Sequence, residues 1–206
     1  MQKQMKKFIP MVLLAMLILP AHAQKKGYSP GYIIDAEGNR IEGWVKDRSS
    51  GTFFDLYPQI RFKPENAIFK RKFSAEEIQA YGFNDQHFES MPLFEETAFF
   101  KFRYYLHESH RMVFLKVISR QQDLTYYHWE YVDDESNYLD YIPLFHRFGS
   151  GEMVRVSQGI LGLKRNRLTE YFRDCPDLVR AIENKELKEI SEVYSFYLES
   201  CARNIN

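Results

Sequence analysis

The chain has few cysteines, no excess charge of either sign and no long apolar run. Cys175 and Cys201 are its two cysteines in 206 residues, which excludes a dense disulfide scaffold. Lys and Arg total 28, and so do Asp and Glu, which argues against a general nucleic-acid-binding protein. The apolar run at residues 8–19 is about 12 residues long, short of the roughly 20 that span a bilayer. The remaining composition, 45% hydrophobic and 27% charged, is typical of a globular protein.

Residues 1–23 have the three parts of an export signal. Lys3, Lys6 and Lys7 form a basic start, residues 8–19 are apolar, and Ala21 and Ala23 are the small residues of a cleavage site. The sequence therefore predicts cleavage after Ala23 and an exported protein of the periplasm or cell surface. No cysteine follows the apolar run directly, so we expect no lipid anchor and, after cleavage, no membrane span. Loss of the three lysines would give the mature chain a net charge of −3.

Two alternatives are open for Cys175 and Cys201. They can form a disulfide, or they can remain two buried thiols. Export favours the disulfide, because an oxidising compartment permits it. In the chain-entropy model, a bond across this separation contributes about 3–4 kcal/mol.

Residues 24–156 have the pattern of a mostly β region. Two β-rich runs around residues 36–39 predict a hairpin, and four further strands are predicted from residue 100 to residue 148. Pro143 has no N–H for a ladder, so its strand is expected to be an edge strand or to bend. Ser74 and Glu77 have the spacing of a capping box, which predicts a short helix ending at Gly82.

Residues 157–206 change to helical spacing. Pro176 is expected to begin a helix that buries Leu178 and Ile182, and a last helix is expected to end its apolar face at Cys201. The predicted fold class is α+β, a curved antiparallel β-meander with a C-terminal helical segment. Residues 24–206 are expected to form a single domain.

Two polar segments contain potential metal ligands. His107, Glu108 and His110 are groups that zinc accepts, and the acidic segment 133–140 has oxygen ligands suited to calcium. The histidines lie in a predicted hairpin turn, and the acidic segment lacks the glycine and late glutamate of a calcium loop. Both segments are interpreted as solvated turns, so no metal or cofactor is expected.

The sequence also contains groups that could serve catalysis or nucleic-acid binding, but they lack the surrounding motif or charge that these functions need. His146 and Ser150 could act as base and nucleophile, but no nucleophile-elbow sequence surrounds Ser150, and its glycine neighbours are typical of a turn. The basic clusters at residues 70–72 and 164–167 are interpreted as solvated surface, given the net charge of the mature chain. We therefore expect no catalytic residue and no nucleic-acid partner.

Aromatic residues are abundant: 17 phenylalanines, 14 tyrosines and two tryptophans make up 16% of the chain. Tyr127, Trp129 and Tyr131 share one face of the predicted strand 124–132, and Tyr126 and His128 share the other. One face must pack on a core, and the other can form an exposed platform for sugar rings or a partner chain. Alternatively, the sheet core and the helices cover both faces. The candidate binding residues are Trp129, Tyr127 and Tyr131, and Trp129 is the first choice among them.

The sequence resembles a group of uncharacterised exported proteins of Bacteroidota. The resemblance lies in the Gly31-Tyr-Ile-Ile hairpin, in the segment 114–117 and in the tail Asp174-Cys-Pro-Asp-Leu178. It implies a secreted bacterial protein with a role in the cell envelope, and it carries over no catalytic residue.

Two functions follow as hypotheses. The first is a secreted, non-catalytic cell-envelope protein that binds a partner protein or glycan. The alternative is an extracellular hydrolase acting on a polymer, because catalytic groups can assemble from distant positions. A pocket with converging titratable groups would favour the hydrolase, and an exposed aromatic surface would favour binding.

Overall fold

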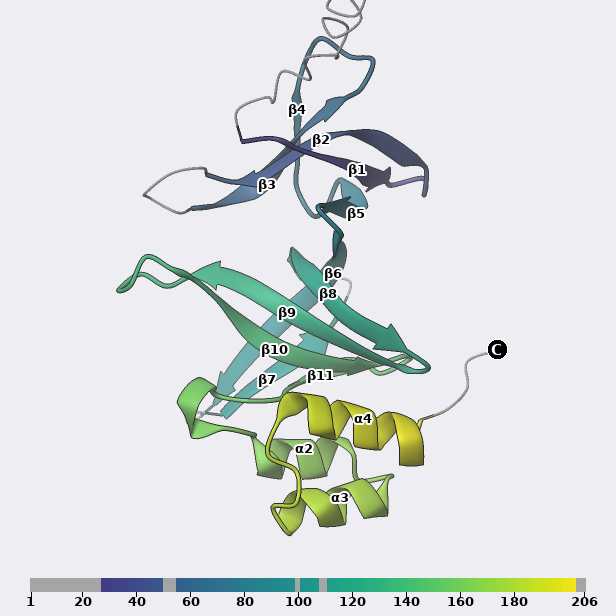
Figure 1. Cartoon of the computed structure of the whole chain (residues 1–206), viewed down its shortest axis with the longest axis vertical. Coiled ribbons are helices and arrows are strands. Elements are labelled where there is room, and N and C mark those ends of the chain that lie inside the picture. The colour runs from purple at the N-terminus through teal and green to yellow at the C-terminus, as the bar shows by residue number, and fades with distance from the viewer. Residues whose placement is uncertain (1–26, 50–54, 99–100, 108–110, 203–206) are drawn as a thin grey trace, which may run out of the picture.

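The computed structural model describes residues 27–49, 55–98, 101–107 and 111–202 (Figure 1). The predicted signal and its cleavage site lie outside the described residues. Within them, eleven strands form one antiparallel sheet and helices follow it, which confirms the α+β prediction. The strands are β1 (Ser29–Asp35), β2 (Arg40–Arg48), β3 (Leu56–Pro64), β4 (Arg71–Phe73), β5 (Ile78–Phe83), β6 (Gln86–Ala98), β7 (Lys101–Leu106), β8 (Met112–Gln121), β9 (Leu124–Val132), β10 (Leu139–Arg147) and β11 (Glu152–Arg155).

The sheet has two parts that meet at strand β6. Strands β4, β3, β2, β1 and β5 lie side by side in that order and are called the N-terminal sheet. Strands β6, β7, β11, β10, β9 and β8 follow, and a pairing between β6 and β8 closes these six into a barrel. Figure 1 shows the N-terminal sheet at one end of the long axis, the barrel in the middle and the helices at the other end.

Each part has its own apolar core. Ile33, Val45 and Phe62 are among the buried residues of the N-terminal sheet, and Leu115 and Leu144 are fully buried inside the barrel. A third cluster lies between the barrel and the helices. Alternate residues of each strand enter a core, as the period of two in a strand requires.

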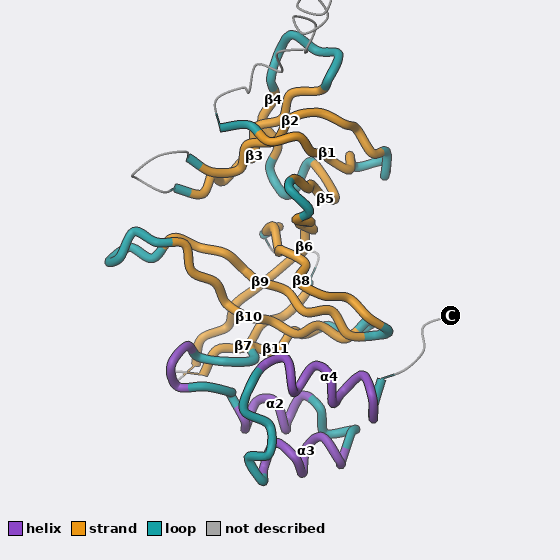
Figure 2. Tube along the Cα trace, viewed as in Figure 1, coloured by secondary structure: helices purple, strands orange, loops and turns teal. Residues whose placement is uncertain are grey.

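The helices are α2 (Arg165–Tyr171), α3 (Pro176–Glu183) and α4 (Ile190–Ser200), preceded by a 3₁₀ turn at Gly159–Leu161 (Figure 2). Pro176 is in the first turn of α3, and Leu178 and Ile182 are fully buried, as predicted. Proline suits this position because the first N–H groups of a helix have no intrahelical partner.

The predicted disulfide is present. Cys175 precedes α3 and Cys201 follows α4, and their Cα atoms are 5.7 Å apart. The bond ties the start of α3 to the end of α4, so the two helices are held at one end by a covalent link.

The predicted helix at residues 74–82 is wrong. Ser74 and Glu77 form one of the two hydrogen bonds of a capping box, in which the Ser74 N–H donates to Glu77 Oε2 at 2.8 Å. The second is absent, because the Ser74 hydroxyl donates to the same carboxylate and the Glu77 N–H donates to the Ser74 carbonyl oxygen. The turn does not propagate, because Ile78–Phe83 pairs as strand β5 with β1 and β6. Long-range pairing and burial of Ile78 and Tyr81 override the local helix signal.

Of the two alternatives for Pro143, an edge strand or a bend, the edge strand is wrong. Strand β10 lies between β9 and β11, and Pro143 is opposite His128 of β9. The pairing with β11 begins only at Leu144, after the proline. Next to this pairing, the Val156 N–H donates to the Pro143 carbonyl oxygen at 2.9 Å, and the Val156 carbonyl oxygen accepts from the Lys164 N–H at 2.8 Å. The N–H that Pro143 lacks is therefore replaced by that of Lys164.

Candidate binding cleft

A cleft of about 530 Å³ lies between the N-terminal sheet and the barrel. On one side it is lined by the start of β3 and by the turn that precedes β5. On the other side it is lined by the start of β8 and the end of β9. Aromatic, polar and aliphatic side chains line it, among them Tyr57, Gln59, Arg111, Trp129 and Glu130.

Four charged residues form a network of ion pairs at the boundary between the N-terminal sheet and the barrel. Arg48 of β2 binds Asp47 through two hydrogen bonds of 2.8 and 2.7 Å and reaches Glu130 of β9 at 3.0 Å. Lys116 of β8 is 3.3 Å from the other oxygen of Glu130. Because Asp47 is 4% exposed and the Glu130 side chain 10%, little solvent screens these ion pairs.

Tyr81 completes this network from the core of the N-terminal sheet. Its hydroxyl donates to Asp47 at 3.2 Å, and its ring stacks on Phe88 with 4.5 Å between centroids. Burial raises the pKa of Tyr81 well above its ordinary value, and the charge of Asp47 raises it further. The phenol therefore stays protonated and serves as a hydrogen-bond donor. Asp47 is thus bound on two sides, by a guanidinium and by a phenol.

The three candidate aromatic residues have different surroundings. Trp129 is half-buried, lines the cleft and meets Tyr104 edge-on inside the barrel, with 6.4 Å between centroids. Tyr131 is 37% exposed and donates to Asp140 at 2.9 Å. Tyr127 is 2% exposed inside the barrel, so it offers no platform to a ligand. Trp129 is therefore the member of this set that meets the cleft.

The opposite face of β9 is covered as well. Tyr126 packs against the helical cluster, and His128 stacks on Tyr141 with 3.7 Å between centroids. Burial and the nearby Lys116 lower the pKa of His128 to about 4, so this imidazole is neutral at physiological pH. Neither face of β9 is thus a flat exposed aromatic patch, and contact with a ligand is confined to the cleft end of the strand.

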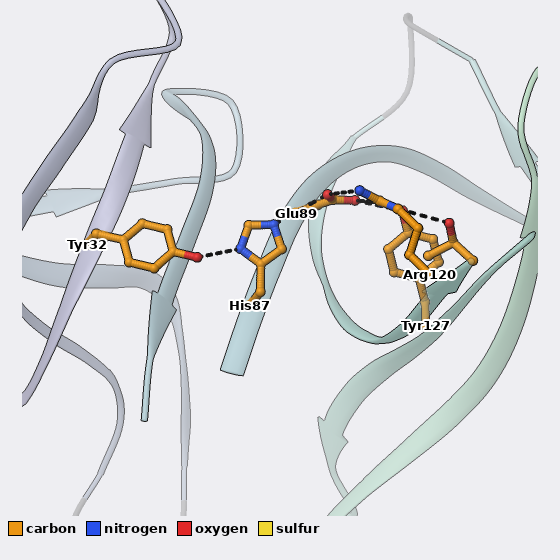
Figure 3. A network of polar contacts seen from close by, with 6 residues as sticks. Tyr32, His87, Glu89, Arg120 and Tyr127 are labelled. Atoms are coloured by element: carbon orange, nitrogen blue, oxygen red, sulfur yellow. Dashed lines mark hydrogen bonds and ion pairs between the residues drawn. The ribbon is translucent and has the colours of Figure 1, made fainter. Parts of the chain in front are cut away.

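A second polar network closes one end of the barrel (Figure 3). Glu89 of β6 accepts hydrogen bonds from Arg120 at 2.9 and 2.5 Å and from the Tyr127 hydroxyl at 2.6 Å. His87 lies 3.3 Å from Glu89 through Nε2, and its Nδ1 is 2.8 Å from the Tyr32 hydroxyl. This geometry fits an imidazole protonated at Nε2 that donates to Glu89 and accepts from Tyr32.

The charge of Glu89 is fixed by these partners. Burial alone would raise the pKa of Glu89, but hydrogen bonds from His87, Arg120 and Tyr127 outweigh it and lower the pKa to about 2. For Tyr127, burial and the hydrogen bond to Glu89 raise the pKa of the hydroxyl. Glu89 is therefore a permanent anion at physiological pH and is fully occupied by structural hydrogen bonds.

Gly82 allows Tyr32 to reach His87. Tyr32, Gly82 and His87 lie opposite one another in strands β1, β5 and β6. A Cβ at Gly82 would come within 2.7 Å of two ring carbons of Tyr32. Gly82 therefore does not end a helix, as the sequence had indicated, but leaves space for a tyrosine ring to cross the strand.

Other candidate residues do not assemble into sites. His107 is described, but the remainder of the predicted zinc cluster, residues 108–110, lies outside the described residues. His146 Nε2 contacts the Ser150 carbonyl oxygen at 3.0 Å, whereas the Ser150 hydroxyl donates to the Glu152 carbonyl oxygen. In the described parts of the chain, no group of three or more His, Cys, Asp or Glu residues is arranged to hold a metal ion.

Comparison with protein-family models, curated proteins and solved structures finds no match for this chain. In the residues described here, no helix combines the length and apolar character needed to cross a membrane.

Sequence reasoning found Trp129 but missed the charged residues around it. Arg48 and Glu130 are separated by 82 positions, and Glu89 and Arg120 by 31. The signal that could have marked Asp47 is its place in β2, where an acidic residue alternates with the apolar Val45 toward the core. A charge on the apolar face of a strand indicates a buried partner.

Proposed function

We propose that this is an exported, non-catalytic protein of the cell envelope that binds a glycan in the cleft beside Trp129. Its export is supported by the leader pattern of residues 1–23, and the disulfide is compatible with an oxidising compartment. The observation that carries the proposal is that a half-buried indole lies in a cleft that polar and apolar side chains line together.

This combination suits a sugar chain better than an apolar ligand. Sugar rings present apolar C–H faces that pack on aromatic rings, and hydroxyl groups that need hydrogen-bond partners. Trp129 and Tyr57 are two of the aromatic residues that line the cleft, and Gln59, Glu76 and Arg111 can form hydrogen bonds with a ligand.

Two of the three carboxylates that line the cleft, Asp47 and Glu130, are held by cations, which supports binding over hydrolysis. Glycoside hydrolysis in most enzymes uses two carboxyl groups, one of which holds a proton for the leaving group. Here Arg48 bonds to both Asp47 and Glu130, and Lys116 bonds to Glu130 as well. These contacts are those of a structural ion-pair network that joins two parts of the fold.

Tryptophan fluorescence provides a direct test, because the chain contains only two tryptophans. In a Trp44→Phe variant, Trp129 is the only indole, and it should change its emission when chitotetraose, cellotetraose or soluble peptidoglycan fragments are titrated. The matched Trp129→Phe variant reports from Trp44, on the outer face of the N-terminal sheet, and should give no change. Gln59→Ala, at the exposed rim, should weaken the response of Trp129 without altering the melting temperature.

Three outcomes would contradict the proposal. The first is that Trp129 gives no response to any of these glycans. The second is an equal response from Trp44, which would show that the cleft is not the site. The third is the appearance of shortened oligosaccharides during incubation, which would support the hydrolase instead.

A further inference from the structure

Three cations lie directly side by side on the outer face of the N-terminal sheet. Lys46 of β2 is opposite Arg61 of β3, and Arg61 is opposite Lys72 of β4. All three point away from the core, because their neighbours Val45, Phe62 and Phe73 are buried in it. We call Lys46, Arg61 and Lys72 the cationic row.

The cationic row is unfavourable for the isolated protein. Like charges directly opposite in an antiparallel pair destabilise a sheet. Nothing among the described residues offsets this repulsion with an ion pair, since none of the carboxylates there pairs with Lys46, Arg61 or Lys72. Arg61 instead lies over the ring of Tyr57, 4.2 Å from its centroid. An arrangement that costs stability and lacks an internal partner fits an external anion.

Two exposed apolar side chains lie next to this row. Ile68 and Phe69, in the loop between β3 and β4, are 85% and 79% exposed. Lys70 follows them directly, and Lys63 lies on the same face of β3 as Arg61. In Figure 2 the loop that joins β3 to β4 lies at the end of the molecule opposite the helices. Because both side chains are so exposed, they are accessible to a large flat surface.

We propose that the β3–β4 loop and the cationic row dock this protein on an anionic phospholipid surface. Ile68 and Phe69 enter the headgroup region, and Lys46, Arg61 and Lys72 lie against the lipid phosphates. Basic residues close to an anionic bilayer are each worth about 1 kcal/mol, which corresponds to about fivefold in affinity. Neither the apolar pair nor the cationic row alone gives stable binding to lipid. Together they supply the two signals that stable anchoring requires.

The apolar pair favours a membrane over other anionic partners. A nucleic acid or an acidic protein would satisfy the cationic row, but it would leave Ile68 and Phe69 in water. A second exposed apolar pair, Ile160 and Leu161, provides a comparison within the same chain. The cations that follow it are engaged elsewhere: Lys164 lies over Phe102, Arg165 donates to the Ile182 carbonyl oxygen, and Arg167 pairs with Glu170.

Vesicle co-sedimentation tests the proposal. The chain from Gln24 onward retains every described residue and lacks the apolar leader, which would itself bind lipid. It should sediment with vesicles of phosphatidylglycerol and phosphatidylcholine in equal amounts, and remain in solution with phosphatidylcholine alone. The triple variant Lys46→Gln, Arg61→Gln, Lys72→Gln should lose roughly a hundredfold in affinity, at about fivefold per charge. Ile68→Ser with Phe69→Ser should lose roughly tenfold.

Two matched variants serve as controls. Arg173→Gln, Arg180→Gln and Lys188→Gln removes three exposed cations from the helical end, and Ile160→Ser with Leu161→Ser removes the second apolar pair. Both should sediment as the parent protein does. All variants should keep the circular dichroism spectrum of the parent, which separates lost binding from lost folding.

Any of three results would overturn the proposal. Equal sedimentation with anionic and with neutral vesicles would show that charge does not drive the binding. A loss in either control variant as large as in its counterpart would show that the site is not the β3–β4 face. Tight binding of a single-stranded oligonucleotide that is unaffected by Ile68→Ser with Phe69→Ser would assign the cationic row to a nucleic acid. The glycan titration reports on the cleft, so failure of either experiment leaves the other independent.

Discussion

The guanidinium of Arg48 lies 3.0 Å from the carboxylate of Glu130, and this contact joins strand β2 of the N-terminal sheet to strand β9 of the barrel. The same guanidinium holds the buried Asp47. One side chain thus neutralises two carboxylates at the boundary between the two parts of the fold.

Replacing Arg48 should destabilise the protein strongly. In Arg48→Met, Asp47 keeps only the Tyr81 hydroxyl among the partners described above, and a buried carboxylate without its cation is costly. The expected loss in the free energy of unfolding is about 2–4 kcal/mol, measured by urea denaturation. Arg40→Met breaks an ion pair whose side chains are more than half exposed, and should cost less than about 1 kcal/mol. Equal losses in the two variants would contradict the assigned role of Arg48.

Glu89 should make stability depend on pH in the acid range. Its pKa is about 2 in the folded protein, below the ordinary value of 4.5, so the unfolded chain binds a proton first as the pH falls. The stabilisation is complete above about pH 4.5 and is lost between pH 4.5 and pH 2. It amounts to about 3 kcal/mol, which corresponds to the lowering of the pKa from 4.5 to about 2.

The check is the free energy of unfolding measured from pH 7 to pH 2. Glu89→Gln should be less stable than the parent at pH 7, and its curve should fall less steeply below pH 4.5. Glu199→Gln, which alters an exposed residue of α4, should follow the parent curve. If Glu89→Gln and the parent have parallel curves, Glu89 is not the group responsible.

The disulfide should stabilise the helical segment. Cys201→Ser should lower the free energy of unfolding by about 3 kcal/mol, because the bond closes a loop with a sequence separation of 26. Adding Cys175→Ser should cost little more, since one substitution already removes the cross-link. A non-reducing peptide map should join the two cysteine peptides. Equal stability of the parent protein with and without reductant would refute this contribution.

Cleavage of the leader stays a prediction from the sequence. Mass spectrometry of protein recovered outside the inner membrane should show a chain that starts at Gln24. An intact Met1 in that fraction would contradict the signal-peptide interpretation.

Local signals predicted the elements that depend on neighbouring residues. Helix α3 begins at Pro176 and buries Leu178 and Ile182, as predicted. Both signals, a proline at the start and apolar residues at helical spacing, lie within a few residues of one another in the sequence. The Ser74–Glu77 pattern shows the limit of such signals. One of its two hydrogen bonds forms, yet the following residues pair with β1, which lies far away in the sequence, and with β6.

The features that depend on distant pairs were not predictable from one sequence. The meander from β8 to β10 was expected, but the predicted hairpin between β7 and β8 is wrong, because β7 pairs with β6 and β11 instead. The closure of the barrel by β6 and β8 was not expected, because it depends on which edges meet in space. The cleft follows from that closure. Trp129 could be singled out by its chemistry, whereas its neighbours Arg48 and Glu130 gained their meaning only when β2 was placed beside β9.

The position of strand β6 determines how the N-terminal sheet can move relative to the barrel. His87–Glu89 is hydrogen-bonded along one edge to β5 and along the other to β8, so these three residues form the shared seam of both parts. Widening the cleft therefore requires the N-terminal sheet to rotate about this seam, and the Arg48–Glu130 contact must lengthen as it does so. The seam acts as a hinge and the ion pair as a latch. Because the carboxylates of Asp47 and Glu130 are nearly buried, salt screens this ion pair little, so the entry of a ligand too large for the resting cleft should depend only weakly on ionic strength.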